Sequence, residues 1–356
     1  MSRQISLFGA EGREGRAKGG RHGKMLTMNF TERTGRKPIV AVLVGDRSVV
    51  GLERVAALAE IRETGAAGLP SALRGADVLY LWDYFSGALE PAWKHADSLQ
   101  WLHVAAAGVD KLLFSDLVES PVTVTNAHGV FDRPMAEYVL GAMLFSAKGF
   151  GQTRDQQHHR VWGRRTTRNI AGARVLIVGT GSIGRCTARL LTAAGADVDG
   201  AGRVARKGDS DFGTVHCSSD LAAVVGAYDW VVLVAPLTPQ TDGMVSADVL
   251  DAMSPSSYLI NVGRGRLVDE PALVRVLADG GIAGAVLDTF AVEPLPTTSP
   301  LWGMDQVLIS PHMASDADSW LEDLARQFET HFLTWHAGDR LPHPVDKALG
   351  YVPTSG

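Results

Sequence analysis

Three side chains in the last third of the chain, Arg264, Glu293 and His312, are of the types that bind an anionic carbonyl compound and move a proton. A guanidinium forms paired hydrogen bonds with a carboxylate or a polarised carbonyl. A histidine delivers a proton near neutral pH, and a neighbouring carboxylate would stabilise the imidazolium and fix the ring. Taken singly, each residue has a plain structural explanation: an arginine in a glycine turn, a loop charge before Pro294 and a capped loop histidine. Together they predict an acid–base site for a small anion.

Each of these residues follows a predicted strand. After the apolar-faced segment PMAEYVLGAMLFSAKGF, the chain alternates Val-, Ile- and Leu-rich runs with helical patterns such as SIGRCTARLLTAAG and EPALVRVLADGG. The strand candidates are RVLIVG, ADVDGAG, DWVVLVAP, SYLINVG, IAGAVLD and QVLISP. This alternation predicts a doubly wound parallel sheet, in which ligands bind beyond the carboxyl ends of the strands. The three residues should therefore meet in one cleft, although they are far apart in sequence.

The segment GTGSIG, residues 179–184, follows the first of these strands and opens a helix. Glycines here permit a tight turn and close approach of a pyrophosphate, and the helix N-terminus supplies N–H donors. A purely structural glycine turn is the alternative for the motif alone. The strand before it, the helix after it and five further strands favour dinucleotide binding.

The residue that would meet the adenosine ribose lies about 20 residues past such a motif. Gly202 stands 18 residues after Gly184, and Arg203, Arg206 and Lys207 follow it. No carboxylate is available for the ribose 2′-hydroxyl, whereas cations suit a 2′-phosphate. The alternative is a solvated basic turn. The sequence favours NADP over NAD and leaves NAD open.

An earlier series of elements begins near Lys37. Its strand candidates are PIVAVLVG, ADVLYLW, QWLHVAA and VTVTNA, with VVGLERVAALAE and PAWKHADSL as amphipathic segments between them. A single amphipathic helix, DSWLEDLARQFETHFLTWHAG, closes the chain. The predicted fold class is α/β with two doubly wound parallel-sheet domains. Residues 1–37 carry nine Lys/Arg against three Glu in a Gly-rich setting, so we expect a disordered basic arm, with a nucleic-acid-binding tail as the alternative.

Composition bounds the remaining classes. The 356 residues are 46% hydrophobic and 21% charged, as in an ordinary globular protein, and the net charge of −5 gives no support to a nucleic-acid or acidic-membrane role. Two cysteines, Cys186 and Cys217, cannot form a disulfide framework and show no zinc spacing, so we assign no metal and expect a reducing cytoplasm. No apolar run is long enough for a membrane span.

From about residue 38 to 351 the sequence resembles the D-isomer-specific 2-hydroxyacid dehydrogenase family, and the glyoxylate/hydroxypyruvate reductases within it. The matching segments are VGTGSIGR, DWVVLVAPLTPQTDGMVS, SYLINVGRGRLVDEPALVRVL, GIAGAVLDTFAVEPLPTTSPLW and VLISPHMA. The resemblance implies hydride transfer between a nicotinamide cofactor and a 2-keto or D-2-hydroxy acid. It implies that Arg264 binds substrate, that His312 is the acid–base and that Glu293 is its partner.

The resemblance also implies a domain plan and further site residues. A Rossmann cofactor domain, residues 132–312, is inserted in a flavodoxin-like substrate domain, residues 38–131 plus 313–351, and the protein is a homodimer. Backbone groups near Ala107 and Gly108 would take the substrate carboxylate, and Asp288 the nicotinamide carboxamide. The candidate cofactor-binding residues are Gly179, Gly181, Ser182, Ile183, Gly184, Arg203, Pro236, Thr241, Val262, Gly263 and Asp288.

One residue separates this chain from one rival class, a second rival is left open, and one segment departs from many members of the family. A formate or phosphite dehydrogenase shares the fold, but the resemblance implies a glutamine beside the histidine in formate enzymes, where this chain has Glu293. A dinucleotide-sensing interaction protein would keep all three residues, so turnover of 2-keto acids must decide. In WDYFSG, residues 82–87, Trp82 or Tyr84 shapes the pocket or, alternatively, fills the core.

Overall fold

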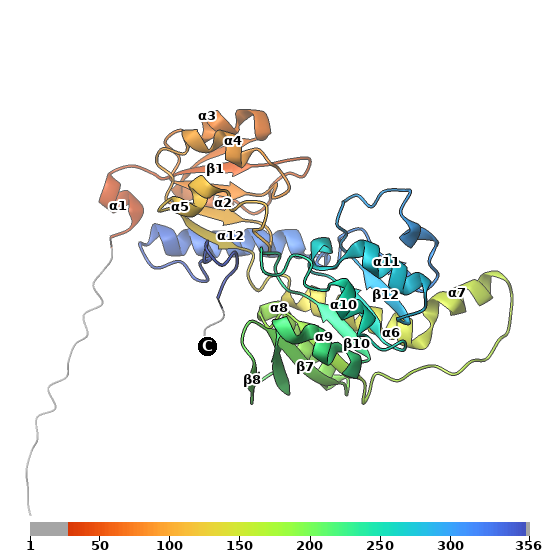
Figure 1. The fold of residues 1–356 in the computed structure, drawn as a ribbon. Helices are drawn as coiled ribbons and strands as arrows, with labels where there is room; N and C mark the ends of the chain where they lie inside the picture. Colours follow the sequence, from red (N-terminus) through yellow and green to blue (C-terminus); the bar gives the residue numbers. More distant parts are fainter. Residues whose placement is uncertain (1–27, 354–356) are drawn as a thin grey trace, which may run out of the picture.

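The structure, a computed structural model, describes residues 28–353 and contains two parallel β-sheets, each covered by helices (Figure 1). The first sheet has the order β2-β1-β3-β4-β5. Its strands are β1 (Ile39–Leu43), β2 (Glu60–Thr64), β3 (Val78–Leu81), β4 (Trp101–Val104) and β5 (Thr123–Asn126). This is the flavodoxin-like order. Its connecting helices are α2 (Glu53–Leu58), α3 (Leu69–Leu73), α4 (Leu89–Ala92) and α5 (Ser115–Glu119).

The second sheet has the order β13-β12-β11-β10-β6-β7-β9-β8. Its strands are β6 (Arg174–Val178), β7 (Asp197–Gly202), β8 (Arg206–Lys207), β9 (Thr214–Cys217), β10 (Trp230–Leu233), β11 (Tyr258–Asn261), β12 (Gly284–Leu287) and β13 (Val307–Ile309). Read from β9, the order is that of the Rossmann fold with one further strand, and only β8 pairs antiparallel. The direction of winding reverses between β6 and β10, which is where such sheets bind dinucleotides.

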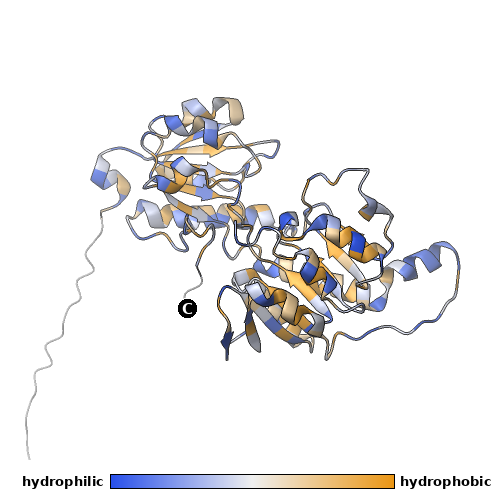
Figure 2. Cartoon of the chain, in the orientation of Figure 1, coloured by the Kyte–Doolittle hydropathy of each residue, from blue (hydrophilic) through white to orange (hydrophobic). Residues whose placement is uncertain are grey.

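Helices of the second domain are α6 (Asp132–Lys148), α7 (Phe150–His158), α8 (Ser182–Ala193), α9 (Leu221–Val224), α10 (Ala247–Asp251) and α11 (Glu270–Ala278). Its central strands are apolar on both faces because helices cover both, and Figure 2 shows these strands in orange beneath bluer helices. Val232 of β10 lies in register with Ile177 on one side and Ile260 on the other. The predicted two-sheet α/β fold class is confirmed.

The C-terminal helix α12 (Trp320–His336) packs on the first sheet, far from it in sequence (Figure 1). Phe328 stacks on Tyr80 of β3 with ring centroids 3.9 Å apart and on Trp101 of β4 at 5.4 Å. All three rings are fully buried. The first sheet is therefore built from residues 39–126 and covered on one side by a helix from residues 320–336.

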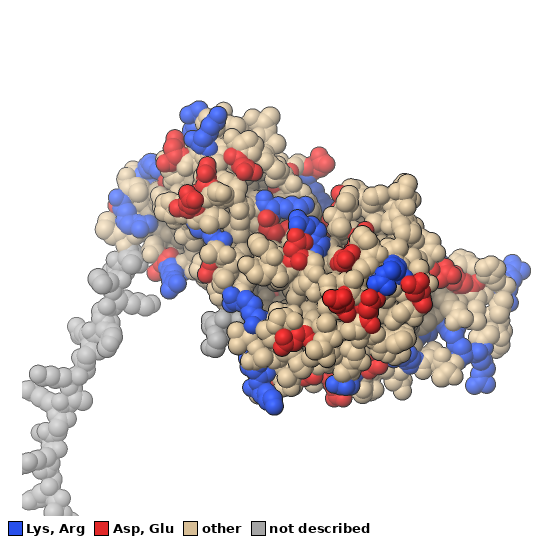
Figure 3. All heavy atoms as spheres, viewed as in Figure 1, with Lys and Arg blue, Asp and Glu red and all other residues tan. Residues whose placement is uncertain are grey.

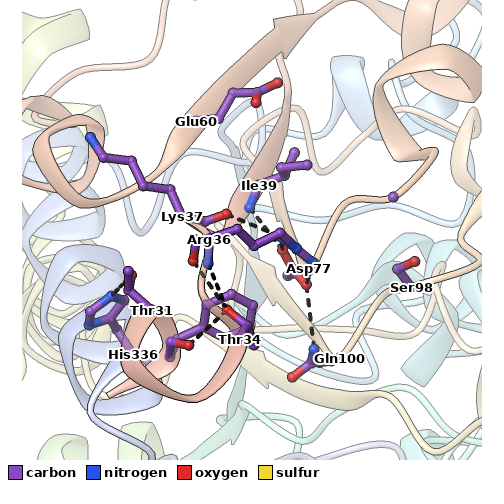
Figure 4. Close-up of polar contacts among 12 residues, drawn as sticks. Thr31, Thr34, Arg36, Lys37, Ile39, Glu60, Asp77, Ser98, Gln100 and His336 are labelled. Carbon is purple, nitrogen blue, oxygen red and sulfur yellow. Dashed lines mark hydrogen bonds and ion pairs between the residues drawn. The ribbon is translucent and has the colours of Figure 1, made fainter. Parts of the chain in front are cut away.

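Part of the segment predicted as a disordered basic arm is folded: residues 30–34 form a helix. Residues 1–27 lie outside the described part, but α1 (Phe30–Thr34) is a helix with an Asn29–Glu32 capping box, and Phe30 is buried against Trp335 of α12. Figure 4 shows Arg36 reaching the buried Asp77 through two hydrogen bonds of 2.7 and 2.8 Å, and Asp77 also accepts the Ile39 N–H. The boundary at residue 37 was wrong because one buried phenylalanine and one ion pair anchor this segment.

Strands β2, β8 and β9 were not predicted. The expected helix VVGLERVAALAE is shorter, since α2 ends at Leu58 and β2 begins at Glu60. β2 is an edge strand, so its charged residues Glu60, Arg62 and Glu63 remain partly exposed and the apolar signal is weak. β8 has two residues and β9 has four, with little apolar character.

Candidate active site

A cavity of about 430 Å³ lies where the carboxyl ends of both sheets face each other. Loops that follow β3, β4, β11, β12 and β13 line it. The lining residues that the sequence predicted are Tyr84, Ala107, Gly108, Val262, Arg264, Asp288, Glu293 and His312. Arg264, Glu293 and His312, which follow three separate strands, therefore meet in one cavity, as the strand pattern indicated.

His312 and Glu293 form a direct pair in this cavity. The His312 Nδ1 lies 2.9 Å from the Glu293 Oε2, and each side chain is 30% exposed. Glu293 Oε1 accepts the Phe290 N–H at 3.0 Å. Burial opposes ionisation of Glu293, but the hydrogen bonds from His312 and Phe290 outweigh it, so the pKa of this carboxyl is lowered. Glu293 is therefore a carboxylate near neutral pH, and Nε2 of His312 has no partner among the described residues.

The backbone of His312 is strained, and Asp288 holds it in place. His312 has a φ of 51°, a left-handed conformation that costs a non-glycine residue about 1–3 kcal/mol. Its N–H donates to the Asp288 carbonyl at 2.9 Å. The Asp288 carboxylate, 1% exposed, accepts the N–H groups of Met313 and Ala314 and the Ser310 hydroxyl at 3.0, 2.9 and 2.5 Å. Asp288 thus holds the backbone from which the His312 side chain extends, and Glu293 binds the ring itself.

Arg264 enters the cavity directly after β11. Its Nε lies 3.1 Å from the Asp110 Oδ1, and Nη1 donates to the Gly263 carbonyl at 2.9 Å. The flanking glycines serve close packing and not a left-handed turn, because neither has a positive φ. A Cβ on Gly265 would lie 1.8 Å from the Phe290 carbonyl carbon, and one on Gly263 would lie 2.8 Å from Leu267 Cδ1. Glycine at position 265 therefore lets the loop that carries Arg264 pack against the loop after β12, and glycine at position 263 leaves room for Leu267.

The loop after β4 presents backbone donors beside Arg264. The N–H groups of Ala107 and Gly108 donate to no acceptor among residues 28–353. A Cβ on Gly108 would lie 1.9 Å from the Arg264 Nη2, so glycine is required for the guanidinium to approach this loop. The Asn126 amide donates to the Ala107 carbonyl and holds the loop from below. Free N–H groups beside a guanidinium form a receptor for a carboxylate.

The glycine motif has the geometry of a phosphate cradle. Gly179 ends the β6 turn with a φ of 114°, and a Cβ there would lie 2.7 Å from the Ala235 nitrogen. A Cβ on Gly184 would lie 1.9 Å from the Gly179 carbonyl oxygen. Gly181 caps the N-terminus of α8 without a side-chain hydrogen bond, so the N–H groups at Ser182 and Ile183 are available to an anion. The site fits a dinucleotide.

The basic turn after β7 is only partly free. Gly202 is the last residue of β7, so the turn does lie at the ribose end of a Rossmann sheet. Arg206, however, is paired with Asp209 at 2.8 Å, and Arg185 binds the same carboxylate, which keeps the pKa of Asp209 well below its usual range. Arg203 instead lies over the Tyr351 ring, 5.4 Å from its centroid. Of the three cations expected for a 2′-phosphate, Arg206 is engaged elsewhere.

Of the eleven predicted cofactor residues, only Val262 and Asp288 line the cavity; besides the glycine motif and Arg203, those outside it are Pro236, Thr241 and Gly263, at strand ends of the same sheet. Thr241 Oγ1 donates to the Pro236 carbonyl at 2.6 Å and accepts the Thr238 N–H at 2.8 Å, so it shapes the loop after β10. Gly263 N–H donates to the Asn261 side chain at 3.1 Å. Of the two aromatic candidates, Tyr84 lines the cavity, whereas Trp82 is a core residue only 5% exposed.

Three charged residues of the cavity lining were missed from the sequence: Arg266, which pairs with Asp242, and the neighbours Asp110 and Lys111. The two neighbours lie in the loop after β4 and line the cavity. Their signal was a charged pair directly after a buried strand, VAAAGVDK. The Asp110–Arg264 contact joins residues 154 positions apart, which a strand pattern does not reveal.

Charge elsewhere is mixed. On the face drawn in Figure 3, Lys and Arg are interspersed with Asp and Glu and form no broad patch of one sign. Within residues 28–353, no group of three His, Cys, Asp or Glu is arranged to hold a metal ion, and no helix is long and apolar enough to cross a bilayer.

Known proteins resemble this chain in sequence and in fold. Residues 140–314 match the family model of the D-isomer specific 2-hydroxyacid dehydrogenase NAD binding domain. A glyoxylate/hydroxypyruvate reductase of Arabidopsis thaliana is 30% identical over 65% of this chain and 72% of its own length.

Solved structures extend the likeness to both domains. A D-isomer specific 2-hydroxyacid dehydrogenase of Xanthobacter autotrophicus, in complex with NADPH and MES, has a TM-score of 0.75 and 30% identity, covering 88% of this chain and 100% of the other. An NADPH-dependent glyoxylate/hydroxypyruvate reductase of Sinorhizobium meliloti, in complex with NADP and sulfate, has a TM-score of 0.75 and 27% identity, covering 89% and 100%.

Proposed function

The chain belongs to the D-isomer-specific 2-hydroxyacid dehydrogenase family, and we propose that it reduces a 2-keto acid to the D-2-hydroxy acid with NADPH. The observation that carries this proposal is the 2.9 Å pair of His312 and Glu293, which leaves Nε2 of His312 free in the cavity that Arg264 lines. An acid–base group and a carboxylate-binding group in one cavity are what the reduction of a keto acid needs.

The cofactor would lie along the second sheet. Gly179, Gly181 and Gly184 would admit its pyrophosphate to the N-terminus of α8, and its nicotinamide would supply a hydride to the substrate carbonyl carbon. Asp288 lines the cavity and remains the proposed partner of the carboxamide, with Val262 beside it.

The chain's own residues would do the rest. The Arg264 guanidinium and the N–H groups of Ala107 and Gly108 would hold the substrate carboxylate and orient its carbonyl. His312 would donate a proton from Nε2 to the carbonyl oxygen as negative charge develops there. Glu293 would keep the imidazolium in place by accepting the Nδ1 proton in a hydrogen bond. Arg264, His312 and Glu293 are therefore the proposed catalytic set.

The charges at the ribose end support NADPH as the preferred cofactor. Gly202 offers no carboxylate to a ribose hydroxyl, and Asp199 of β7 is engaged by the Thr214 N–H and the Tyr228 hydroxyl. Arg203 and Lys207 form no ion pair among the described residues, so both are available to a 2′-phosphate. Relatives solved with NADPH or NADP are consistent with this preference.

A panel of 2-keto acids tests the proposal. Glyoxylate, hydroxypyruvate and pyruvate would each be mixed with NADPH and, separately, NADH, and oxidation of the cofactor followed by absorbance. We expect turnover of at least one acid, faster with NADPH, and a product of D configuration where the product is chiral. Binding of NADPH without oxidation by any acid, in protein shown to be folded, would instead favour a dinucleotide-sensing interaction protein.

We further propose a homodimer formed through the segment that contains α7 and residues 159–169. This segment projects from the second domain in Figure 1 and exposes Phe150, Val161 and Trp162, whose exposed fractions are 51, 55 and 98%. Large apolar side chains exposed together mark an interaction surface. Trp162→Glu should produce monomers in light scattering, whereas Val50→Glu on the first domain should not; a dimeric Trp162→Glu protein would contradict the proposal.

The two free cysteines are consistent with a proposed cytoplasmic location.

A further inference from the structure

The loop after β4 places a lysine at the cavity without an ion-pair partner. Lys111 lines the cavity, and its Nζ lies 5.5 Å from the centroid of the Phe85 ring. The other charged groups there are engaged: Arg264 with Asp110, Arg266 with Asp242 and His312 with Glu293, while Asp288 accepts three hydrogen bonds. No carboxylate of the described residues lies within ion-pair distance of Lys111. Among the Lys and Arg side chains that line the cavity in the described chain, Lys111 alone has no ion-pair partner.

Phe85 places this charge on the histidine side of the cavity. The Phe85 ring, 58% exposed, meets the His312 ring edge-on with centroids 6.2 Å apart and contacts Tyr84 at 4.4 Å. The pKa of Glu293 reflects burial, which raises it, and the groups that lower it, namely His312, Phe290 and lastly Lys111. The Lys111 charge therefore reaches the acid–base pair. Arg264 and Lys111 approach the cavity as two separate cationic positions.

We propose that Lys111 binds a second carboxylate at the distal end of the substrate, so that dicarboxylic 2-keto acids are the preferred substrate class. This inference rests on the proposed reduction of 2-keto acids. With Arg264 and the Ala107 and Gly108 N–H groups on the first carboxylate and His312 at the carbonyl oxygen, the substrate's side chain extends toward Phe85 and Lys111. A single free ammonium balances one negative charge, which suits a carboxylate better than a phosphate dianion.

The expected gain is that of one charge-assisted hydrogen bond at a partly exposed site. Such a bond corresponds to roughly a 10-fold preference for the anionic substrate, and it should shrink as salt is added. Phe85 contributes an apolar surface for the methylene groups between the two carboxylates, and the lysine stays over the aromatic face while it binds.

A matched pair of substrates tests the assignment. 2-Oxoglutarate and 5-methyl-2-oxohexanoate have nearly the same shape, since two methyl groups of the second replace the two oxygens of the distal carboxylate, but only the first is charged at that end. In the wild type we expect a kcat/KM ratio of about 10 in favour of 2-oxoglutarate. Lys111→Met should bring this ratio close to 1, and Lys111→Arg should retain most of it. Lys94→Met, which removes an exposed lysine of the same domain, is the control and should leave the ratio as in the wild type.

Each other outcome is decisive. A wild-type ratio at or below 1, or a ratio that Lys111→Met leaves unchanged, overturns the role of Lys111. Turnover of glyoxylate or pyruvate with no turnover of either larger acid also overturns the inference, while the proposed function stands. Failure of every keto acid, small or large, overturns the proposed function itself.

Discussion

The proposed substrate site and the proposed nucleotide site use ion pairs in opposite ways. At the proposed substrate site, Glu293 binds the Nδ1 of His312 and Asp110 binds only the Nε of Arg264, so Nε2 of His312 and Nη2 of Arg264 have no partner among the described residues. At the proposed nucleotide site, Asp209 takes both Arg206 and Arg185, whose guanidinium groups are occupied by this and the neighbouring carboxylate. An ion pair with a carboxylate therefore orients Arg264 and His312 at the first site, whereas at the second site it occupies the guanidinium of Arg206.

The comparison shows that residue type and position alone do not give a cation's role. What decides is which atoms of the group remain after internal partners have been satisfied. At the proposed substrate site, Arg264 and His312 line the cavity and keep donor atoms without a partner. At the proposed nucleotide site, only Arg203 and Lys207 are without an ion pair among the described residues.

The largest effect should come from Arg264. Arg264→Ala removes the fork that would bind the substrate, so kcat/KM for a 2-keto acid should fall on the order of 1,000-fold while the Kd for NADPH changes little. Arg264→Lys should restore little, because a point charge does not replace a planar fork. Steady-state kinetics and cofactor titration measure both quantities. The matched control is Arg275→Ala on α11, whose partner is Asp251 outside the cavity; near-wild-type kcat/KM in Arg264→Ala would remove this residue from the site.

A change of pH behaviour should follow from Glu293→Gln. A carboxylate hydrogen-bonded to an imidazole stabilises the charged ring, so the loss of the carboxylate should move the alkaline limb of keto-acid reduction to lower pH. Because the pKa of Glu293 is lowered, its charge is present throughout the neutral range and is lost only as pH falls below the ordinary carboxyl range. Glu137→Gln on the exposed face of α6 is the control. A pH–rate profile of Glu293→Gln that overlays the wild type would contradict the pairing.

The sequence located most strands of the two sheets, and it indicated that Arg264, Glu293 and His312 meet in one cavity, because both depend on local signals. Buried strands rich in Val, Ile and Leu can be recognised from their composition, and Arg264, Glu293 and His312 each follow such a strand. The edge strand β2 gave too little apolar contrast to be found. The role of the glycines around Arg264 also required the structure: they have no positive φ, and their missing Cβ atoms leave room for Phe290 and Leu267.

Long-range pairing was the part that the sequence could not supply. Tyr351 lies over Arg203 although 148 positions separate them, and Asp110 reaches Arg264 across 154 positions. The sequence of the basic turn did contain a local sign that Arg206 is paired. Asp209 stands three residues after Arg206, which lies in the two-residue strand β8. Charges that neutralise one another locally have to be subtracted before a binding site is inferred from the remainder.

A smaller effect should appear at Arg203. Arg203→Ala should raise the KM for NADPH about 10-fold and change that for NADH much less, because one charge-assisted bond to the 2′-phosphate is lost. The wild-type preference should also weaken as salt increases. Equal kcat/KM for both cofactors in the wild type at low salt would reduce the turn to a solvated surface. Inverting the preference through Gly202→Asp with Arg203→Ala also requires room, since a Cβ at position 202 would lie 3.0 Å from Thr180 Oγ1.

The smallest effect should come from Asp209→Asn. Removing this carboxylate frees Arg206 and lessens the negative charge beside the turn, so the KM for NADPH should fall by a few-fold, on the order of 2- to 5-fold for an exposed charge. Asp220→Asn, on an exposed turn without an ion pair in the described chain, is the control. A rise in the KM for NADPH would mean that the Asp209 pairs shape the binding site instead of competing with it.

The most direct test of the acid–base unit is a double-mutant cycle on glyoxylate reduction with NADPH. The kcat of His312→Gln, Glu293→Gln and the double variant would be measured at one pH, with cofactor binding as the check on folding. If Glu293 acts only through His312, the double variant should be no slower than His312→Gln alone, because the partner has nothing left to orient. Losses that multiply, so that the double variant is slower by the product of the two single effects, would show that the two residues act independently and would contradict the account.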